Sequence, residues 1–157
     1  MDHGIRAAEL FVSGYNCAQS VAVAFCDVTG LDEKTSARMA SSFGGGMGRM
    51  REVCGAVSGM MMVLGYLYGY DTPGDDRQKK RLYTDVQALA HAFQDQAGSY
   101  VCREILKNPP SDPNPSPRTQ QYYAQRPCAR MAWLAASLLD QYIENHPLEA
   151  PYEWSDL

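Results

Sequence analysis

Four of the five cysteines in this 157-residue chain lie at or near the expected start of a helix. They are Cys17, Cys54, Cys102 and Cys128. The unpaired N–H groups at a helix start carry about half a positive charge, and they favour a thiolate over a thiol. Because a thiolate is both a nucleophile and a metal ligand, this repeated placement predicts one shared sulfur site.

Local sequence supports these assignments. Cys17 follows Asn16, a good N-cap residue, and Cys128 follows Pro127, which suits the first turn of a helix. Cys26 is different, because it is expected near the C-terminal end of its helix, where the helix dipole disfavours a thiolate. We therefore leave Cys26 out of the predicted site.

The spacing of the four cysteines excludes several familiar sites. Successive members are 37, 48 and 26 residues apart and form no CxxC pair, so zinc-finger, thioredoxin and ordinary ferredoxin patterns do not apply. Two chemistries remain open: thiol–disulfide or electron-transfer redox, and Cys₄ ligation of an iron–sulfur cluster or zinc. A third reading treats the cysteines as small buried hydrophobic residues of a non-catalytic helical interaction protein.

Glycines surround Cys54 on both sides. Gly55 and Gly59 either permit tight helix packing or let a ligand approach the sulfur, which makes them candidate cofactor-binding residues. The glycine-rich stretch 44–48 could form a nest of N–H groups that binds an anion, although it lacks the lysine and serine of a phosphate-binding P-loop.

Arginines lie close in sequence to two of the candidate cysteines. Three arginines lie within a few residues of a candidate cysteine and could favour its thiolate: Arg49, Arg51 and Arg103. An ordinary solvated charge is the alternative for each. The histidines are scattered and expected at the surface or at helix ends, which gives no support to a Cys–His dyad: His3, His91 and His146.

Periodic apolar residues and capping signals predict helices throughout the chain. The helices are expected between residues 2 and 14, 16 and 30, 32 and 44, about 50 and 70, 75 and 98, 99 and 106, and 127 and 145. No stretch shows sustained β alternation. We predict an all-α class, with residues 1–157 forming a single compact bundle of about six to seven helices around an apolar central helix.

Two segments are expected outside this bundle. Residues 108–117 hold five prolines in ten residues and predict an extended surface loop. Residues 146–157 contain Pro147 and Pro151 and predict an extended tail.

The central helix raises the question of a membrane. Residues 53–70 are eighteen residues without a charge, the length at which a transmembrane helix is considered. The segment contains four glycines, ends among tyrosines, and has charged segments on both sides. We therefore predict a buried helix rather than a membrane span.

Composition limits the partners. A net charge of −4 and a pI near 5.3 argue against nucleic acid. No cationic start leads into an apolar run, so we expect a cytoplasmic protein, where clustered thiols favour redox or metal chemistry. Exposed tyrosines suggest a homodimer: Tyr66, Tyr68, Tyr70, Tyr122 and Tyr123.

Taken together, these motifs resemble the C_GCAxxG_C_C family of redox-active proteins. The matching segments are Tyr15-Asn16-Cys17-Ala18-Gln19, Phe43 to Gly48, Val53-Cys54-Gly55-Ala56-Val57-Ser58-Gly59, Cys102-Arg103-Glu104 and the late Cys128. The family label writes its central letters as GCA, whereas this chain has Cys54-Gly55-Ala56.

The resemblance implies redox activity for the four cysteines and again omits Cys26. It also implies a functional link to membrane transport systems. It names neither a substrate nor a cofactor, so the redox partner, which is another protein or a small molecule, stays open. The function that we predict is thiol-dependent oxidoreduction or electron transfer, with Cys₄ metal or cluster binding as the alternative.

Overall fold

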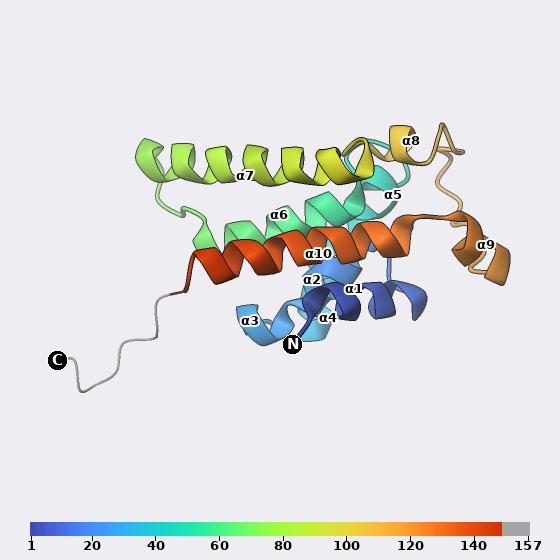
Figure 1. Cartoon of the computed structure of the whole chain (residues 1–157), viewed down its shortest axis with the longest axis horizontal. Coiled ribbons are helices and arrows are strands. Elements are labelled where there is room, and N and C mark those ends of the chain that lie inside the picture. The colour runs from blue at the N-terminus through green and yellow to red at the C-terminus, as the bar shows by residue number, and fades with distance from the viewer. Residues whose placement is uncertain (149–157) are drawn as a thin grey trace.

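The structure is a computed structural model, and it describes residues 1–148. These residues form ten α-helices and one 3₁₀ turn, without a β-strand (Figure 1), which confirms the all-α class. Six of the helices have eight or more residues, in line with the six or seven expected. Most of the predicted extended tail lies outside the described residues.

The helix bounds follow local signals. In chain order the elements are α1 His3–Val12, α2 Cys17–Ala24, α3 Cys26–Thr29, α4 Glu33–Ala40, η1 Ser41–Phe43, α5 Gly44–Met47, α6 Gly55–Tyr68, α7 Asp76–Ala97, α8 Cys102–Ile105, α9 Gln120–Gln125 and α10 Cys128–Asn145. Asp2, Asn16 and Asp32 are N-caps. The side chain of each accepts a hydrogen bond from the backbone N–H of the residue three positions later in the chain. The cap predicted at Asn16 is thereby confirmed.

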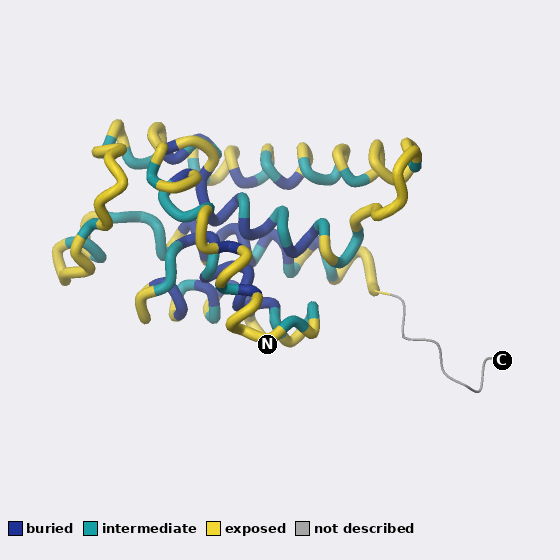
Figure 2. The backbone as a smooth tube through the Cα atoms, turned by 180° about the vertical axis from the view of Figure 1, so that it is seen from behind, coloured by how far each residue is buried: buried dark blue, intermediate teal, exposed yellow. Residues whose placement is uncertain are grey.

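The core lies between three layers of helices. α6 and α10 pack together at the centre, α7 covers one side of them, and α1 and α2 cover the other (Figure 1). Buried apolar side chains from α1, α2, α6 and α10 fill the space between the layers. The outer face of α7 is exposed along its length (Figure 2), and only Leu89 and Phe93 of this helix are buried.

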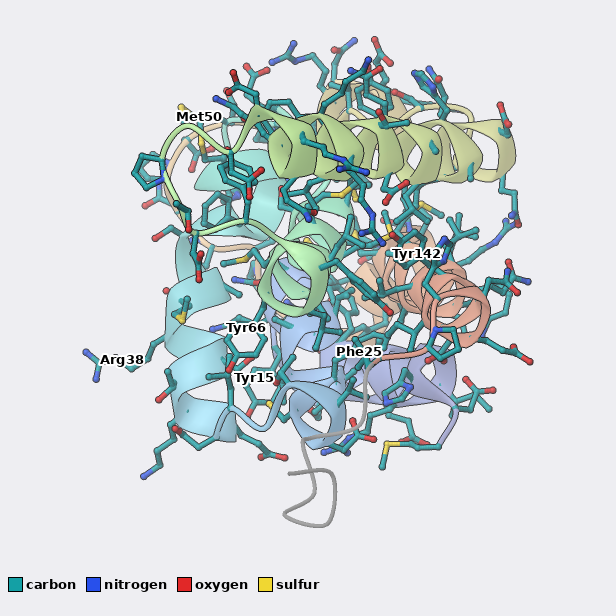
Figure 3. All side chains as sticks on the ribbon, turned by 90° about the vertical axis from the view of Figure 1, so that its left-hand side faces the viewer. Tyr15, Phe25, Arg38, Met50, Tyr66 and Tyr142 are labelled. Carbon is teal, nitrogen blue, oxygen red and sulfur yellow. The ribbon has the colours of Figure 1, made fainter. Side chains whose placement is uncertain are left out.

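The helix expected between residues 16 and 30 is broken. Phe25 has φ −98° and ψ 14°, so α2 ends before it and α3 begins after it. Its ring is fully buried among the helices (Figure 3) and stacks on the His3 ring at 4.2 Å between centroids. Cys26 is therefore the first residue of α3, and its expected place at a helix C-terminus is wrong.

The central helix begins later than expected, at Gly55. Arg49 and Arg51 have left-handed φ values of 66° and 62°, and Val53 pairs with Val101 in an isolated antiparallel bridge. These residues cannot continue a right-handed helix. Within residues 1–148, no helix has the length and apolar character needed to cross a membrane.

Other differences are smaller. α9 is a short helix that the sequence did not predict, and α8 is one turn long. Of the five tyrosines expected at the surface, Tyr66 and Tyr70 are exposed, and the other three are half-buried. The tyrosine argument for a homodimer thus rests on fewer residues, and the homodimer stays a prediction.

Candidate functional site

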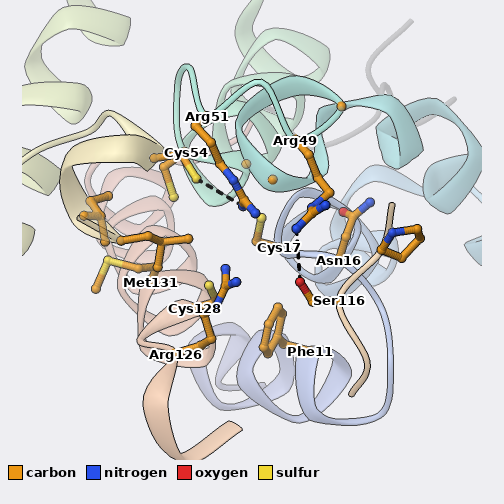
Figure 4. A pocket seen from close by; sticks show the side chains of 18 of the residues that line it. Phe11, Asn16, Cys17, Arg49, Arg51, Cys54, Ser116, Arg126, Cys128 and Met131 are labelled. Atoms are coloured by element: carbon orange, nitrogen blue, oxygen red, sulfur yellow. Dashed lines mark hydrogen bonds between the residues drawn. The ribbon is translucent and has the colours of Figure 1, made fainter. Parts of the chain in front are cut away.

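The four candidate cysteines line one cavity of about 450 Å³. It lies at the end of the bundle where α5, α8 and α9 are found in Figure 1, and Figure 4 shows the side chains around it. Cys17, Cys54 and Cys102 are buried and Cys128 is half-buried. Cys26 does not line this cavity.

Helix starts bring these sulfurs together. Cys17 is the first residue of α2, Cys102 of α8 and Cys128 of α10, whereas Cys54 directly precedes α6. At α2 the cap is reciprocal, since Asn16 accepts from the N–H of Gln19 and the Gln19 side chain accepts from the N–H of Asn16. The prediction that all four cysteines stand at helix starts is confirmed.

A short β-bridge fixes Cys54 relative to Cys102. Val53 lies opposite Val101, the N–H of Cys54 donates to the carbonyl of Tyr100 at 2.8 Å, and the N–H of Cys102 donates to Glu52 at 2.6 Å. Side chains alternate along paired strands, so both cysteines point away from the face that carries the two valines. Val53 is 41% exposed and Cys54 only 6%, so the bridge turns the sulfurs inward.

Glycines allow the close packing of this region. A Cβ on Gly46 would lie 2.7 Å from the Cβ of Cys102, and one on Gly55 would collide with the sulfur of Cys17. Gly59 does not line the cavity; a Cβ there would meet the carbonyl of Ala18 at 2.6 Å, which is tight packing between α6 and α2. A cofactor role for Gly55 and Gly59 remains a prediction.

The glycine loop forms a run of left-handed residues. Gly45, Gly46 and Gly48 all have positive φ, as does Met47 between them. The backbone N–H of Gly45 faces Cys17 and lowers the pKa of that thiol. The polar backbone of this loop is thus turned towards a sulfur of the cavity.

Burial has a larger effect on these thiols than the helix starts have. It raises the pKa of Cys17 and raises that of Cys54 well above the ordinary value, although backbone N–H groups oppose both shifts. Burial also raises the pKa of Cys128 to about 12. The expected activation by helix dipoles is therefore wrong for these three thiols, because desolvation disfavours a buried charge more strongly.

The sulfurs also influence one another. Burial is the largest cause of the raised pKa values, and the charges of neighbouring thiolates add to it. A negative charge on Cys102 raises the pKa of Cys17, and a negative charge on Cys17 raises the pKa values of Cys54 and Cys128. Cys17 thus interacts with each of the other three. Figure 4 shows Cys17, Cys54 and Cys128 around the same cavity.

Four arginines line the same cavity: Arg49, Arg51, Arg118 and Arg126. The first two were candidates from sequence. Arg103, the third candidate, is exposed outside the cavity and pairs with Glu52. Arg126 lies two residues before Cys128, so the proximity criterion could have found it. Arg118 has no comparable signal in the sequence.

The proline-rich segment forms a wall of the cavity rather than only a surface loop. Pro113, Pro115 and Ser116 contribute to the lining. Arg49 donates to the carbonyl of Asp112 at 2.7 Å and to the hydroxyl of Ser116 at 3.2 Å (Figure 4). Two residues further on, Arg51 donates to the carbonyl of Pro110 at 3.0 Å. The arginines after the glycine loop thus hold this segment in place.

Two further findings bear on the predicted chemistry. Within residues 1–148, no group of three or more His, Cys, Asp or Glu side chains that could hold a metal ion is found. Cys₄ ligation of a metal or cluster stays a prediction. His3 lies at a helix end, one of the two placements expected for the histidines, and it is buried between Asp27 and Asp140, away from the cavity. No histidine lines the cavity.

Fold and site define an all-helical protein with a cavity of four thiols and four guanidinium groups. The family model described as "Putative redox-active protein (C_GCAxxG_C_C)" matches residues 15–142. The chain belongs to this family, and the matched range contains all four cysteines of the cavity. No curated protein and no solved structure was found to match the chain.

Proposed function

We propose that this protein is a thiol–disulfide oxidoreductase whose chemistry takes place in the four-cysteine cavity. The observation that carries the proposal is the meeting of four reduced cysteines, from four helix starts, around one cavity of small-molecule size. Membership in a redox-active family points the same way.

Cys102 is the sulfur that we assign to the first attack. A guanidinium nitrogen of Arg51 lies 3.8 Å from it and stabilises negative charge there. In the first step the Cys102 thiolate attacks one sulfur of a small disulfide, forms a mixed disulfide and releases one thiolate.

Cys17 is the sulfur that we assign to the second attack. Its pKa responds to a charge on Cys102, which indicates that the two sulfurs interact. It displaces the second substrate thiolate and leaves a Cys17–Cys102 disulfide. The two thiol protons of the protein end on the two released thiols, so electrons and protons balance. Cys54 and Cys128, which also interact, form a second dithiol.

Trapping of the mixed disulfide tests these assignments. The fully reduced protein is incubated with bis(2-hydroxyethyl) disulfide, quenched with acid, and mapped by peptide mass spectrometry without reduction. We expect the wild type to form a Cys17–Cys102 disulfide and to release two mercaptoethanol molecules for each disulfide formed. Cys17→Ser should accumulate a stable adduct on Cys102, and Cys102→Ser should form neither product.

Cys26→Ser serves as the control, because Cys26 lies outside the cavity, and it should react like the wild type. Circular dichroism of each variant checks that the fold is retained. The proposal is wrong if the cavity thiols stay reduced in the folded wild type, or if Cys17→Ser forms no adduct on Cys102.

A further inference from the structure

The cavity has charge of one sign. Four of its lining residues are arginines and, within the part of the chain that the structure describes, none is aspartate or glutamate. The whole chain carries a net charge of −4. The positive lining is therefore a property of this place in the fold and does not follow from composition.

Among residues 1–148, three of these arginines lack a carboxylate partner. Arg49 pairs with the half-exposed Asp112 at 3.2 Å, but no carboxylate of residues 1–148 lies within ion-pair distance of Arg51, Arg118 or Arg126. Arg51 is only 4% exposed. A buried guanidinium without a carboxylate partner is costly, and an anion in the cavity would offset that cost.

Arg118 and Arg126 meet over one aromatic ring. Their guanidinium carbons lie 5.0 and 5.1 Å from the centre of the Tyr122 ring. Arg118 also donates to the carbonyl oxygens of Phe11 at 3.1 Å and Tyr15 at 3.0 Å. These contacts orient the positive groups without neutralising them, which prepares them to bind carboxylate or other anionic groups.

Three of the four thiols do not cancel this charge. Burial raises the pKa of Cys17, Cys54 and Cys128, so these three are uncharged at neutral pH. An anion that enters the cavity therefore meets guanidinium groups and, at Cys17, Cys54 and Cys128, neutral sulfurs.

We propose that the substrate is a small disulfide that carries anionic groups, held by Arg51, Arg118 and Arg126 beside the four thiols. This inference rests on the proposed thiol–disulfide function. A cavity of about 450 Å³ suits a small molecule rather than a folded protein partner. In the exchange, two protein S–H bonds and the substrate S–S bond break, while one protein S–S bond and two S–H bonds on the released thiols form.

Alkylation by two reagents of nearly equal size tests anion selection without requiring turnover. Iodoacetate is an anion and iodoacetamide is neutral, and peptide mass spectrometry gives the alkylation rate of each cysteine in the reduced protein. We expect the iodoacetate-to-iodoacetamide rate ratio to be about tenfold higher at the cavity cysteines than at the same cysteines in the urea-unfolded chain. Cys26 is the internal control, because its neighbours include Asp27, Asp32 and Glu33, and its ratio should not rise.

Arginine variants locate the effect. Arg126 has no ion pair among the described residues, so Arg126→Gln removes charge with little loss of structure. We expect this variant to lower the iodoacetate-to-iodoacetamide rate ratio at the cavity cysteines. Arg118→Gln should lower that ratio further. The matched control is Arg38→Gln with Arg77→Gln, which removes two exposed charges away from the cavity (Arg38 is labelled in Figure 3). This control should keep the wild-type ratio. Salt at about 1 M should reduce the ratio in the wild type.

Three small disulfides extend the test to the reaction: 3,3′-dithiodipropionate, bis(2-hydroxyethyl) disulfide and cystamine carry negative, zero and positive charge. We expect the oxidation rate to fall in that order. Equal alkylation ratios in folded and unfolded protein, or a ratio unchanged in the Arg118 and Arg126 variants, would overturn the anion inference even if the neutral disulfide still oxidises the protein. A raised ratio without oxidation by any disulfide would support anion binding and overturn the redox function.

Discussion

The guanidinium of Arg51 lies against the sulfur of Cys102, with 3.8 Å between Nη1 and Sγ. Arg51 also donates through Nε to the carbonyl of Pro110 at 3.0 Å. It thereby joins the glycine loop, the start of α8 and the proline-rich segment at one buried point. The sulfur of Cys102 is the ionisable group within hydrogen-bond distance of this guanidinium, so each can balance the charge of the other.

Removal of the Arg51 charge should slow the reaction of Cys102. In Arg51→Gln we expect the rate of Cys102 alkylation by iodoacetamide to fall about fivefold or more, because a charge pair at about 4 Å is worth about 1 kcal/mol even in bulk water. Arg103→Gln is the matched control, since Arg103 is next to Cys102 in sequence but pairs with Glu52 outside the cavity. Equal slowing in both variants would contradict the assignment.

A side chain at Gly55 should disturb Cys17. A Cβ there would meet the sulfur of Cys17 and lie 2.7 Å from the carbonyl oxygen of Phe43. We expect Gly55→Ala to lower the free energy of unfolding by about 1–3 kcal/mol, as overpacking does, and to change the labelling rate of Cys17. Urea denaturation and thiol labelling measure the two effects.

Gly65→Ala in the same helix is the control for that substitution. Nothing outside the helix lies within 4 Å of a Cβ at Gly65, so alanine should raise stability by about 0.5–1 kcal/mol through its better helix propensity. If the two variants had equal stability, close packing at Gly55 would not be the limiting factor.

Alkaline pH should destabilise the reduced protein. The pKa of Cys128 is raised to about 12, and those of Cys17 and Cys54 are also above the ordinary value of 9.0. Below about pH 9 the folded and unfolded states both keep these protons, so the contribution to stability is complete. As pH rises from 9 towards 12, the unfolded chain releases protons that the folded state retains, and the free energy of unfolding falls.

Thermal melts between about pH 8 and 11 check this dependence. Cys128→Ala removes one of the raised thiols, so its Tm should fall less steeply with pH than that of the wild type. The comparison uses the slope, because the substitution can also lower Tm at every pH through lost packing. Parallel slopes would show that Cys128 does not titrate as its burial requires.

His3 should stabilise the junction of α1, α3 and α10. Its Nδ1 lies 2.6 Å from Asp140, its Nε2 lies 2.9 Å from Asp27, and its ring stacks on Phe25. We expect His3→Ala to cost about 1–3 kcal/mol by urea denaturation. His91→Ala, at an exposed position of α7, should change stability by no more than about 0.5 kcal/mol. A neutral result at His3 would mean that its two carboxylates find equivalent partners in water.

Local signals in the sequence determined where most helices begin. Asn16 caps α2 through its neighbour Gln19, and Pro127 precedes α10, because capping involves residues only a few positions apart. The four cysteines could be named for the same reason, since each stands at such a start. Cys26 also begins a helix, so its exclusion rested on a helix end that the structure does not show. The break at Phe25 escaped prediction because it depends on a buried ring stacked against His3 of another helix.

The tertiary structure decided what surrounds the sulfurs. The pairing of Val53 with Val101 joins segments 48 residues apart, and Arg118 and Arg126 reach the cavity from beyond the proline-rich segment. The raised pKa of Cys128 is likewise a product of burial by distant parts of the chain. Helix starts placed the thiols. The desolvation of these thiols and the positive charge of the neighbouring arginines come from contacts between distant parts of the chain, which no local pattern encodes. Sequence therefore predicted which cysteines belong together, and the folded chain determined their protonation and the positive charge beside them.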